Sequence, residues 1–308
     1  MKELLTTSRM ACLLACPRKH YWRYEVYLQR DTDALALRFG SAWHDAMEAR
    51  WQGECYDDAL GMALATDREL DEAMVATVAG LLAGYYARWQ SDPVTVVEPE
   101  REFRYALRGS RSFDLAGKID GLGHLHDGRL VLVEHKTTAS DVGSGSDYWL
   151  RLRANPQVMQ YVLGARAIGW DVDTVLYDVT RKPTIRVRKD ETPEEYGERL
   201  AADCAERPDF YFARREVPIL EDDLAEHRVE QQVLARSILG CRAEARTAAR
   251  PEHGWPRNLS EMSCKLCEYS SFCLQNIVPD PAMPPAGFKV GRRNPELAEN
   301  DGNIGAET

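Results

Sequence analysis

The spacing of apolar and polar residues changes along the chain. Between residues 41 and 90 apolar side chains recur at helical intervals, and Trp43, Met47 and Trp51 stand at i, i+4 and i+8. After residue 93 the pattern switches to β-branched residues alternating with polar ones, which is typical of strands. It does so in five stretches, at 94–97, 102–107, 112–121, 129–136 and 174–180. This pattern predicts a helical insertion at about 45–92 and a sheet in the middle of the chain.

Turn and capping signals predict the connections and the later helices. Asp127-Gly128, between two of the predicted strands, is typical of an antiparallel hairpin. The run Thr192-Pro193-Glu194-Glu195 is a capping box with proline at the first helical position, so we expect a helix through about residue 205. Residues 155–168 and 221–250 also have helical character. From residue 277 the chain is rich in Pro, Gly, Asn and Glu, and we expect a flexible tail over 277–308.

Composition narrows the class of protein. With 308 residues, 44% of them hydrophobic, the chain can bury a full core, and we expect one domain over residues 1–276. No run approaches the roughly 18 apolar residues of a membrane span, and the N-terminus lacks a signal-peptide pattern, so we expect a cytoplasmic protein without membrane contact. The net charge of −10 argues against a protein that coats nucleic acid through a large positive field, although it leaves room for a local basic groove.

Two neighbouring predicted strands carry an isolated carboxylate and a carboxylate-lysine pair. Asp120 ends the first of them, and Glu134-His135-Lys136 lies in the second. Side chains two apart on a strand share a face, so Glu134 and Lys136 point one way and His135 points the other. Asp120, Glu134 and the backbone carbonyl of His135 offer the oxygen ligands that a hard divalent ion prefers, and Lys136 would position a water or stabilise charge on a phosphate. By itself this spacing is a weak signal, because exposed strands often carry charge.

Cysteines gather at the two ends of the chain. Cys264, Cys267 and Cys273 form a Cys-x2-Cys-x5-Cys run, and Cys16 lies far upstream. Four thiolates are the number that a tetrahedral zinc or an iron-sulfur cluster requires, and a chain without a signal peptide is an unsuitable place for a disulfide framework. We therefore expect one metal centre that joins the two ends. Spacing alone does not separate zinc from iron, and Cys12 is an alternative to Cys16.

Two more motifs stand in order around the carboxylates. His44 lies at the start of a predicted helix upstream, and Gln157 and Tyr161 share one face of the helix that follows the lysine. Together with Asp120, the Glu134-x-Lys136 pair and the cysteines, this ordered set resembles the RecB-like branch of the PD-(D/E)XK nuclease superfamily over about residues 8–275. The cysteines make it similar to the iron-sulfur subgroup, which includes AddB-type nuclease domains and CRISPR-associated RecB-like exonucleases.

The resemblance implies an α/β fold: a restriction-endonuclease-like core with a central mixed β-sheet flanked by helices, a helical insertion, and N- and C-terminal segments joined by a metal cluster. It implies metal ligands at His44, Asp120 and Glu134, a catalytic lysine at Lys136, and supporting roles for Gln157 and Tyr161. It also implies a [4Fe-4S] cluster, with Zn²⁺ as the alternative, held by Cys16, Cys264, Cys267 and Cys273.

The same resemblance implies a Mg²⁺- or Mn²⁺-dependent deoxyribonuclease, an exonuclease acting on single-stranded DNA or DNA ends if the helical insertion covers the site. Repair, recombination, phage and CRISPR-related DNA processing are all open as pathways. The chain has no Gly-x4-Gly-Lys-Ser/Thr phosphate loop, so unwinding would need a helicase partner. Two other hypotheses remain. One is a non-catalytic module that binds DNA or protein and is stabilised by a metal cluster. The other is a protein unrelated to nucleic acid whose ends are joined by zinc.

Overall fold

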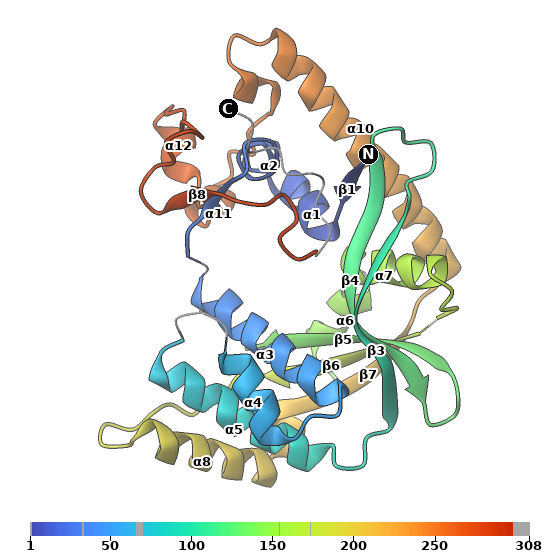
Figure 1. Cartoon of the computed structure of the whole chain (residues 1–308), viewed down its shortest axis with the longest axis vertical. Helices are drawn as coiled ribbons and strands as arrows, with labels where there is room; N and C mark the ends of the chain where they lie inside the picture. Colours follow the sequence, from blue (N-terminus) through green and yellow to red (C-terminus); the bar gives the residue numbers. More distant parts are fainter. Residues whose placement is uncertain (1, 33, 66–69, 154, 173, 298–308) are drawn as a thin grey trace.

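The computed structural model describes residues 2–32, 34–65, 70–153, 155–172 and 174–297 (Figure 1). Its centre is a mixed six-stranded sheet in the order β1-β4-β5-β6-β7, with β3 paired to β4 outside that path. The β1–β4 and β5–β6 pairs are parallel and the other pairs are antiparallel. The strands are β1 (Glu3–Leu5), β3 (Val94–Ala106), β4 (Phe113–Leu125), β5 (Leu130–Thr138), β6 (Thr174–Arg181) and β7 (Phe212–Pro218).

The sheet divides at β4. One edge of β4 pairs with β3 along nearly its whole length, while the other edge pairs first with β1 and later with β5. The β4–β5 pairing runs from His124 opposite Leu130 to Gly121 opposite Val133, and beyond Val133 the strand β5 continues with β6 as its paired neighbour. A fork therefore opens in the sheet at Asp120 and Glu134, the next residue on each strand.

Helices cover both faces of the sheet. On one face α7 packs on alternate strand residues such as Leu132, Val175 and Val179. On the other face Val131 and Val133 meet the residue that ends α3, Trp51. The helices on the α7 side are α1 (Thr7–Ala15), α6 (Asp147–Arg153), α7 (Pro156–Ala167) and α10 (Glu221–Thr247). Those grouped with α3 in Figure 1 are α3 (Leu35–Trp51), α4 (Tyr56–Leu64), α5 (Glu72–Arg88) and α8 (Pro193–Glu206).

Residues 2–30 and 251–297 lie near each other at the opposite end of the molecule from α8 (Figure 1). There β2 (Leu28–Arg30) pairs antiparallel with β8 (Phe288–Val290). Around this two-stranded sheet lie the short helices α2 (Pro17–His20), α11 (Glu261–Lys265) and α12 (Ser270–Leu274), a π-helical turn at Tyr21–Glu25 and a 3-10 turn at Pro251–Gly254. The last short helix, α9 (Pro208–Tyr211), leads into β7.

The segment that we expected to be a flexible tail makes specific contacts as far as Leu297. Besides the pairing of β8, the Arg293 guanidinium lies 3.0 Å from the Glu3 carboxylate. Leu297 is buried against Leu4 and Ala116. The Arg293–Glu3 ion pair and the apolar contacts of Leu297 offset the loss of conformational entropy when this polar segment becomes ordered. The remainder of the expected tail, 298–308, lies outside the described residues.

Most of the predicted elements are confirmed. The helices expected at 155–168, 192–205 and 221–250 are α7, α8 and α10, and Gly128 with φ of 85° closes the β4–β5 hairpin. The strands predicted separately at 94–97 and 102–107 are parts of the single strand β3, which contains irregular register at residues 96–98. Within the described ranges, no helix is long and apolar enough to cross a membrane.

Candidate active site

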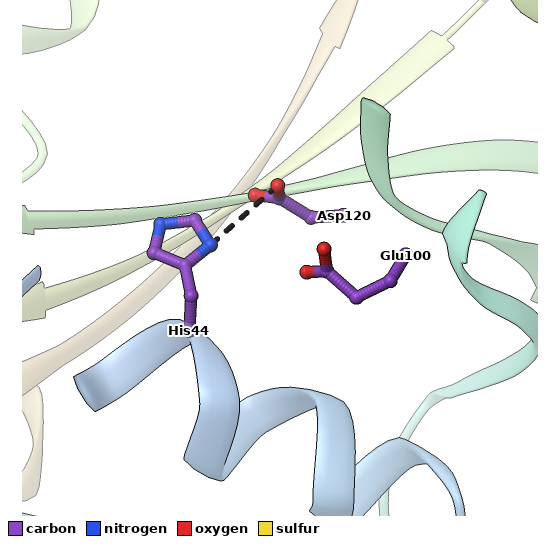
Figure 2. A group of neighbouring side chains, drawn as sticks. All are labelled: His44, Glu100 and Asp120. Atoms are coloured by element: carbon purple, nitrogen blue, oxygen red, sulfur yellow. Dashed lines mark ion pairs between the residues drawn. The ribbon is translucent and has the colours of Figure 1, made fainter. Parts of the chain in front are cut away.

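Three side chains from three elements converge at the fork in the sheet. His44 projects from α3, Glu100 from β3 and Asp120 from β4, and Figure 2 shows them facing one another. One ligand atom from each lies within 4.8 Å of the others, and no other group of His, Cys, Asp or Glu in the described part of the chain is recorded with that geometry. The Nδ1 atom of His44 is 3.5 Å from Oδ1 of Asp120. This spacing suits a shared cation.

Glu100 is the member of this group that the sequence analysis missed. On β3 its neighbours pair in register with Gly121 and Ile119, which places Glu100 opposite Asp120. Its backbone has φ of 50°, a conformation that is uncommon for a residue with a side chain. Burial and the nearby charge of Asp120 raise the pKa of Glu100 to about 7, although Lys118 forms an ion pair with it. Glu100 lies between two segments that the sequence predicts as separate strands. Its irregular backbone therefore interrupts the alternating pattern that would have pointed to it.

Burial shifts the pKa values of Asp120 and His44 in opposite directions. Burial raises the pKa of Asp120, and its Oδ2 atom accepts a hydrogen bond of 2.7 Å from the backbone N–H of His135. This hydrogen bond connects β4 and β5 just beyond their last backbone pair. Enclosure in the site, together with the nearby His135, lowers the pKa of His44 to about 4. His44 is therefore a neutral imidazole near pH 7, the form that binds metal ions.

The Glu134 carboxylate is almost completely buried, and only one of its two oxygen atoms has a partner among the described residues. The side chain is 1% exposed, and its Oε1 atom lies 2.5 Å from Nζ of Lys136. Its Oε2 atom is buried and has no hydrogen-bond partner among the described residues. Burial raises the pKa of Glu134, and the charge of Asp120 adds to this. An orphaned carboxylate oxygen beside two other carboxylates fits a site that receives a cation.

Lys136 is held by a chain of hydrogen bonds that begins on α7. The Lys136 ammonium donates to Oε1 of Gln157 over 2.9 Å, and Nε2 of Gln157 donates to the Tyr161 hydroxyl over 3.0 Å. Burial would lower the pKa of Lys136, but the Glu134 carboxylate outweighs it and the pKa is raised. Gly117 lets this helix approach the sheet, since a Cβ there would lie 2.9 Å from the Tyr161 ring. The result is a fixed positive charge at the site.

The imidazole of His135 faces away from Glu134 and Lys136, as strand alternation predicts. It is 2% exposed, its Nδ1 atom lies 3.4 Å from Asp178, and its Nε2 atom accepts a hydrogen bond of 2.8 Å from the Trp51 indole. The sequence analysis assigned a role only to the backbone of His135. Its side-chain partners come from β6 and α3, which no sequence motif connects to it.

The four cysteines singled out at the ends of the chain line one cavity of about 150 Å³, together with Trp22, Arg18 and Lys19 among others. No three of their sulfur atoms lie within 4.8 Å of one another. Cys16 accepts a hydrogen bond of 3.4 Å from the Asn258 backbone. Burial raises the pKa of Cys12 to about 12, and Cys12 does not line this cavity. Of the two upstream cysteines, Cys16 is the one that faces the other three.

The donor set at the fork fits a hard divalent cation. The carboxylates of Glu100 and Asp120 lie with the His44 imidazole, and Glu134 adds a third carboxylate nearby; only two lysines, Lys118 and Lys136, pair with these acids. Carboxylate oxygen suits Mg²⁺ and Mn²⁺ better than softer metals. A mixed α/β sheet that opens at an acidic, lysine-bearing fork is consistent with a restriction-endonuclease-like core.

Comparison with known proteins gives the family. The model of the PD-(D/E)XK nuclease superfamily matches residues 4–274, and the chain belongs to that superfamily. Two solved structures are among those that match the chain. A suspected exonuclease from Eubacterium rectale is 14% identical, with 92% of this chain and 91% of that chain covered and a TM-score of 0.47. The protein SSO0001 is 13% identical, with 78% and 86% covered and a TM-score of 0.34. No curated protein matches this chain.

Proposed function

We propose that this chain is a Mg²⁺- or Mn²⁺-dependent deoxyribonuclease that hydrolyses phosphodiester bonds in DNA. The observation that carries the proposal is the convergence of His44, Glu100 and Asp120 at the fork of the sheet (Figure 2), with the Glu134–Lys136 ion pair on the neighbouring strand. Carboxylates and a lysine ammonium lie together there. Membership of the nuclease superfamily supports phosphodiester hydrolysis as the reaction.

The chain offers ligands for the ion from three directions. His44 and Asp120 are 3.5 Å apart, Glu100 reaches them from β3, and Glu134 contributes its unpartnered Oε2 atom. We also retain the backbone carbonyl of His135 as a proposed ligand. A bound divalent ion supplies Lewis acidity and makes a water molecule more acidic near neutral pH.

Lys136 is the catalytic lysine in this proposal. Its raised pKa keeps the ammonium protonated, and Glu134 and Gln157 fix the position of Nζ. Negative charge builds on the phosphate oxygens as water attacks phosphorus and the sugar oxygen leaves, and a fixed cation stabilises that charge. Tyr161 orients Gln157, so the two residues on α7 act on the reaction through Lys136.

We further propose an exonuclease that accepts single-stranded DNA or a free DNA end. Helix α3 supplies His44 and, with α4 and α5, forms the helical insertion that lies beside the site (Figure 1). A cover of this kind favours a threaded strand over an intact duplex. Repair, recombination, phage and CRISPR-related processing would all supply such ends, and a helicase partner would supply single strands.

For the cysteine cavity we propose a [4Fe-4S] cluster held by Cys16, Cys264, Cys267 and Cys273. The resemblance of the cysteine pattern to the iron-sulfur subgroup supports the cluster, and Zn²⁺, which four thiolates also bind, is the alternative. Absorption near 400 nm in anaerobically purified protein, with an iron assay, separates the cluster from Zn²⁺.

The test of the nuclease is cleavage of end-labelled single-stranded and duplex DNA in Mg²⁺ or Mn²⁺. Wild type should release short products, and Lys136→Ala should not. Lys189→Ala, which removes an exposed lysine, is the matched control and should behave as wild type. A folded wild type that binds DNA but never cuts it would instead support the alternative, a non-catalytic binding module.

A further inference from the structure

A buried polar layer lies on the face of the sheet opposite Glu134 and Lys136. Its centre is the His135 imidazole, which packs between Asp178 on β6 and Trp51 at the end of α3. His135 and Asp178 are 2% and 1% exposed. Polar groups this deeply buried in a strand core are costly unless they are fixed by partners, so their arrangement calls for a reason.

The hydrogen bond from Trp51 fixes the tautomer of His135. An indole N–H can only donate, so Nε2 of His135 must accept the 2.8 Å bond from Trp51. The proton of a neutral imidazole then lies on Nδ1, the atom 3.4 Å from the Asp178 carboxylate. The ring is held between a donor on one side and an anion on the other, which defines its orientation.

Asp178 is itself held by partners that lead back to α3. It accepts a hydrogen bond from the Tyr85 hydroxyl and lies 3.2 Å from Arg214. Arg214 also binds Asp92 at 2.5 Å and 3.1 Å. Asp92 pairs in turn with Arg50, the residue before Trp51, at 3.1 Å. The network therefore closes on the same end of α3 that contacts His135.

His135 connects this network to the metal ligands in two ways. Through its backbone N–H it donates to Asp120 over 2.7 Å, and through its side chain it holds Trp51. Trp51 lies seven residues after His44 on α3, two helical turns away on the same face. His44 in turn lies 3.5 Å from Asp120. These contacts form a closed circuit through a strand, a helix and the two ligands.

We propose that His135 and Trp51 are positioning residues that set the separation of His44 and Asp120, and through it the affinity of the site for its divalent ion. The inference rests on the proposed metal-dependent function and deepens it. The fork makes such a link necessary, because β4 and β5 no longer pair at Asp120 and α3 is not part of the sheet. Without the link, the relative position of the two ligands would depend on the apolar packing of α3 on the strands.

The first experiment measures Mn²⁺ affinity by titration calorimetry of the whole chain without DNA. Trp51→Phe keeps an aromatic ring and removes only the donor, so we expect Mn²⁺ to bind about 10-fold to 100-fold more weakly, the usual effect of losing a partner behind a metal ligand. Trp89→Phe is the matched control. Trp89 contacts Arg214 in the same layer, but its indole N–H has no partner among the described residues. It should leave Mn²⁺ affinity as in wild type.

A second pair of variants separates positioning from packing. His135→Gln retains a side-chain oxygen that can accept from Trp51, whereas His135→Leu has similar bulk and no acceptor. Both retain the backbone N–H that binds Asp120. We expect His135→Gln to recover most of the Mn²⁺ affinity that His135→Leu loses, and the Mn²⁺ concentration for half-maximal cleavage to follow the same order.

The outcomes are distinct. Wild-type Mn²⁺ affinity in both Trp51→Phe and His135→Leu would overturn the positioning role. So would equal losses in Trp51→Phe and Trp89→Phe, or in His135→Leu and His135→Gln, since packing alone would then explain them. A wild type that binds Mn²⁺ without cutting DNA would overturn only the proposed nuclease, and one that binds no Mn²⁺ would overturn both.

Discussion

Two groups of carboxylates, one partly exposed and one more deeply buried, differ in the direction of their pKa shifts. The first group joins the ends of the chain. Burial alone would raise the pKa of Glu3, but a hydrogen bond from Arg242 and the charges of Arg9 and Arg293 lower it to about 2. Glu3 lies within 3.0 Å of all three guanidinium groups, and Arg9 and Arg242 also pair with Glu25. Positive charge is in excess in this cluster.

The second group is the fork in the sheet, where the shifts are reversed. Burial raises the pKa of Asp120, Glu134 and Glu100, and for Glu100 it reaches about 7. Two lysines face three carboxylates there, so negative charge is in excess. The comparison shows that the role of an ion cluster depends on its ratio of positive to negative charge. The Glu3 cluster is complete within the protein, whereas the fork has the charge that attracts a cation from solution.

The largest effect should come from neutralising the fork. Asp120→Asn keeps an oxygen that can accept from the His135 backbone but removes a negative charge, so we expect DNA cleavage to fall about 10³-fold. Because burial already disfavours the charged form of Asp120, the melting temperature should not decrease. Cleavage of end-labelled DNA and a thermal melt of the same sample test both parts. A variant that melts far below wild type would show that Asp120 supports the fold instead.

The same change at the Glu3 cluster should give the opposite result. Glu3→Gln should lower the free energy of unfolding at pH 7 by about 2 kcal/mol, after allowance for solvent screening, because it removes a carboxylate whose pKa is far below the ordinary 4.5. Its contribution is present above pH 4.5 and is lost as the pH falls towards 2, so the difference from wild type should shrink over that interval. Urea titrations at several pH values measure it. Cleavage per folded molecule should be unchanged.

A smaller effect is expected at Glu100. Glu100→Gln should weaken Mn²⁺ binding about 10-fold, because one of several oxygen ligands loses its charge. Glu98→Gln, two residues earlier on β3, is the matched control, since Glu98 pairs with Arg101 and lies outside the group at the fork. Calorimetric titration with Mn²⁺ compares them. Equal affinities would remove Glu100 from the site.

The smallest effect should come from Tyr161→Phe. Its hydroxyl only orients Gln157, which still reaches Lys136 without it. We expect kcat to fall about 3-fold to 10-fold with little change in the KM for DNA, because the lysine is less well fixed in the transition state while substrate contacts remain. Steady-state kinetics on a labelled oligonucleotide would show this. A raised KM with an unchanged kcat would place Tyr161 in substrate binding.

The sequence predicted those parts of the site that follow a regular repeat. Alternation along a strand placed Glu134 and Lys136 on one face, the hairpin placed Asp120 on the neighbouring strand, and helical spacing aligned Gln157 with Tyr161. It also pointed to four cysteines at the two ends, and these line one cavity. Each of these inferences needs only the geometry of one or two adjacent elements.

The parts that the sequence did not predict depend on irregular backbone or on distant elements. Glu100 reaches the site through a positive φ between residues that read as two separate strands. The partners of His135 lie 84 positions before it, at Trp51, and 43 after it, at Asp178. Strand β7 was also missed, because its run of charged residues at 214–216 does not alternate as a buried strand would. In such segments, contacts with distant parts of the chain decide whether a strand forms and which side chains meet.

The joining of the chain ends has a consequence for how the protein folds. Arg242 reaches Glu3 across 239 positions of sequence, and β2 completes its small sheet only with β8. During synthesis the first 30 residues emerge long before residues 242–293, so several of their partners do not yet exist. We expect strands β3 to β7 of the central sheet to pair first and the N-terminal segment, including β1, to dock late, in a slow step that closes a very long loop.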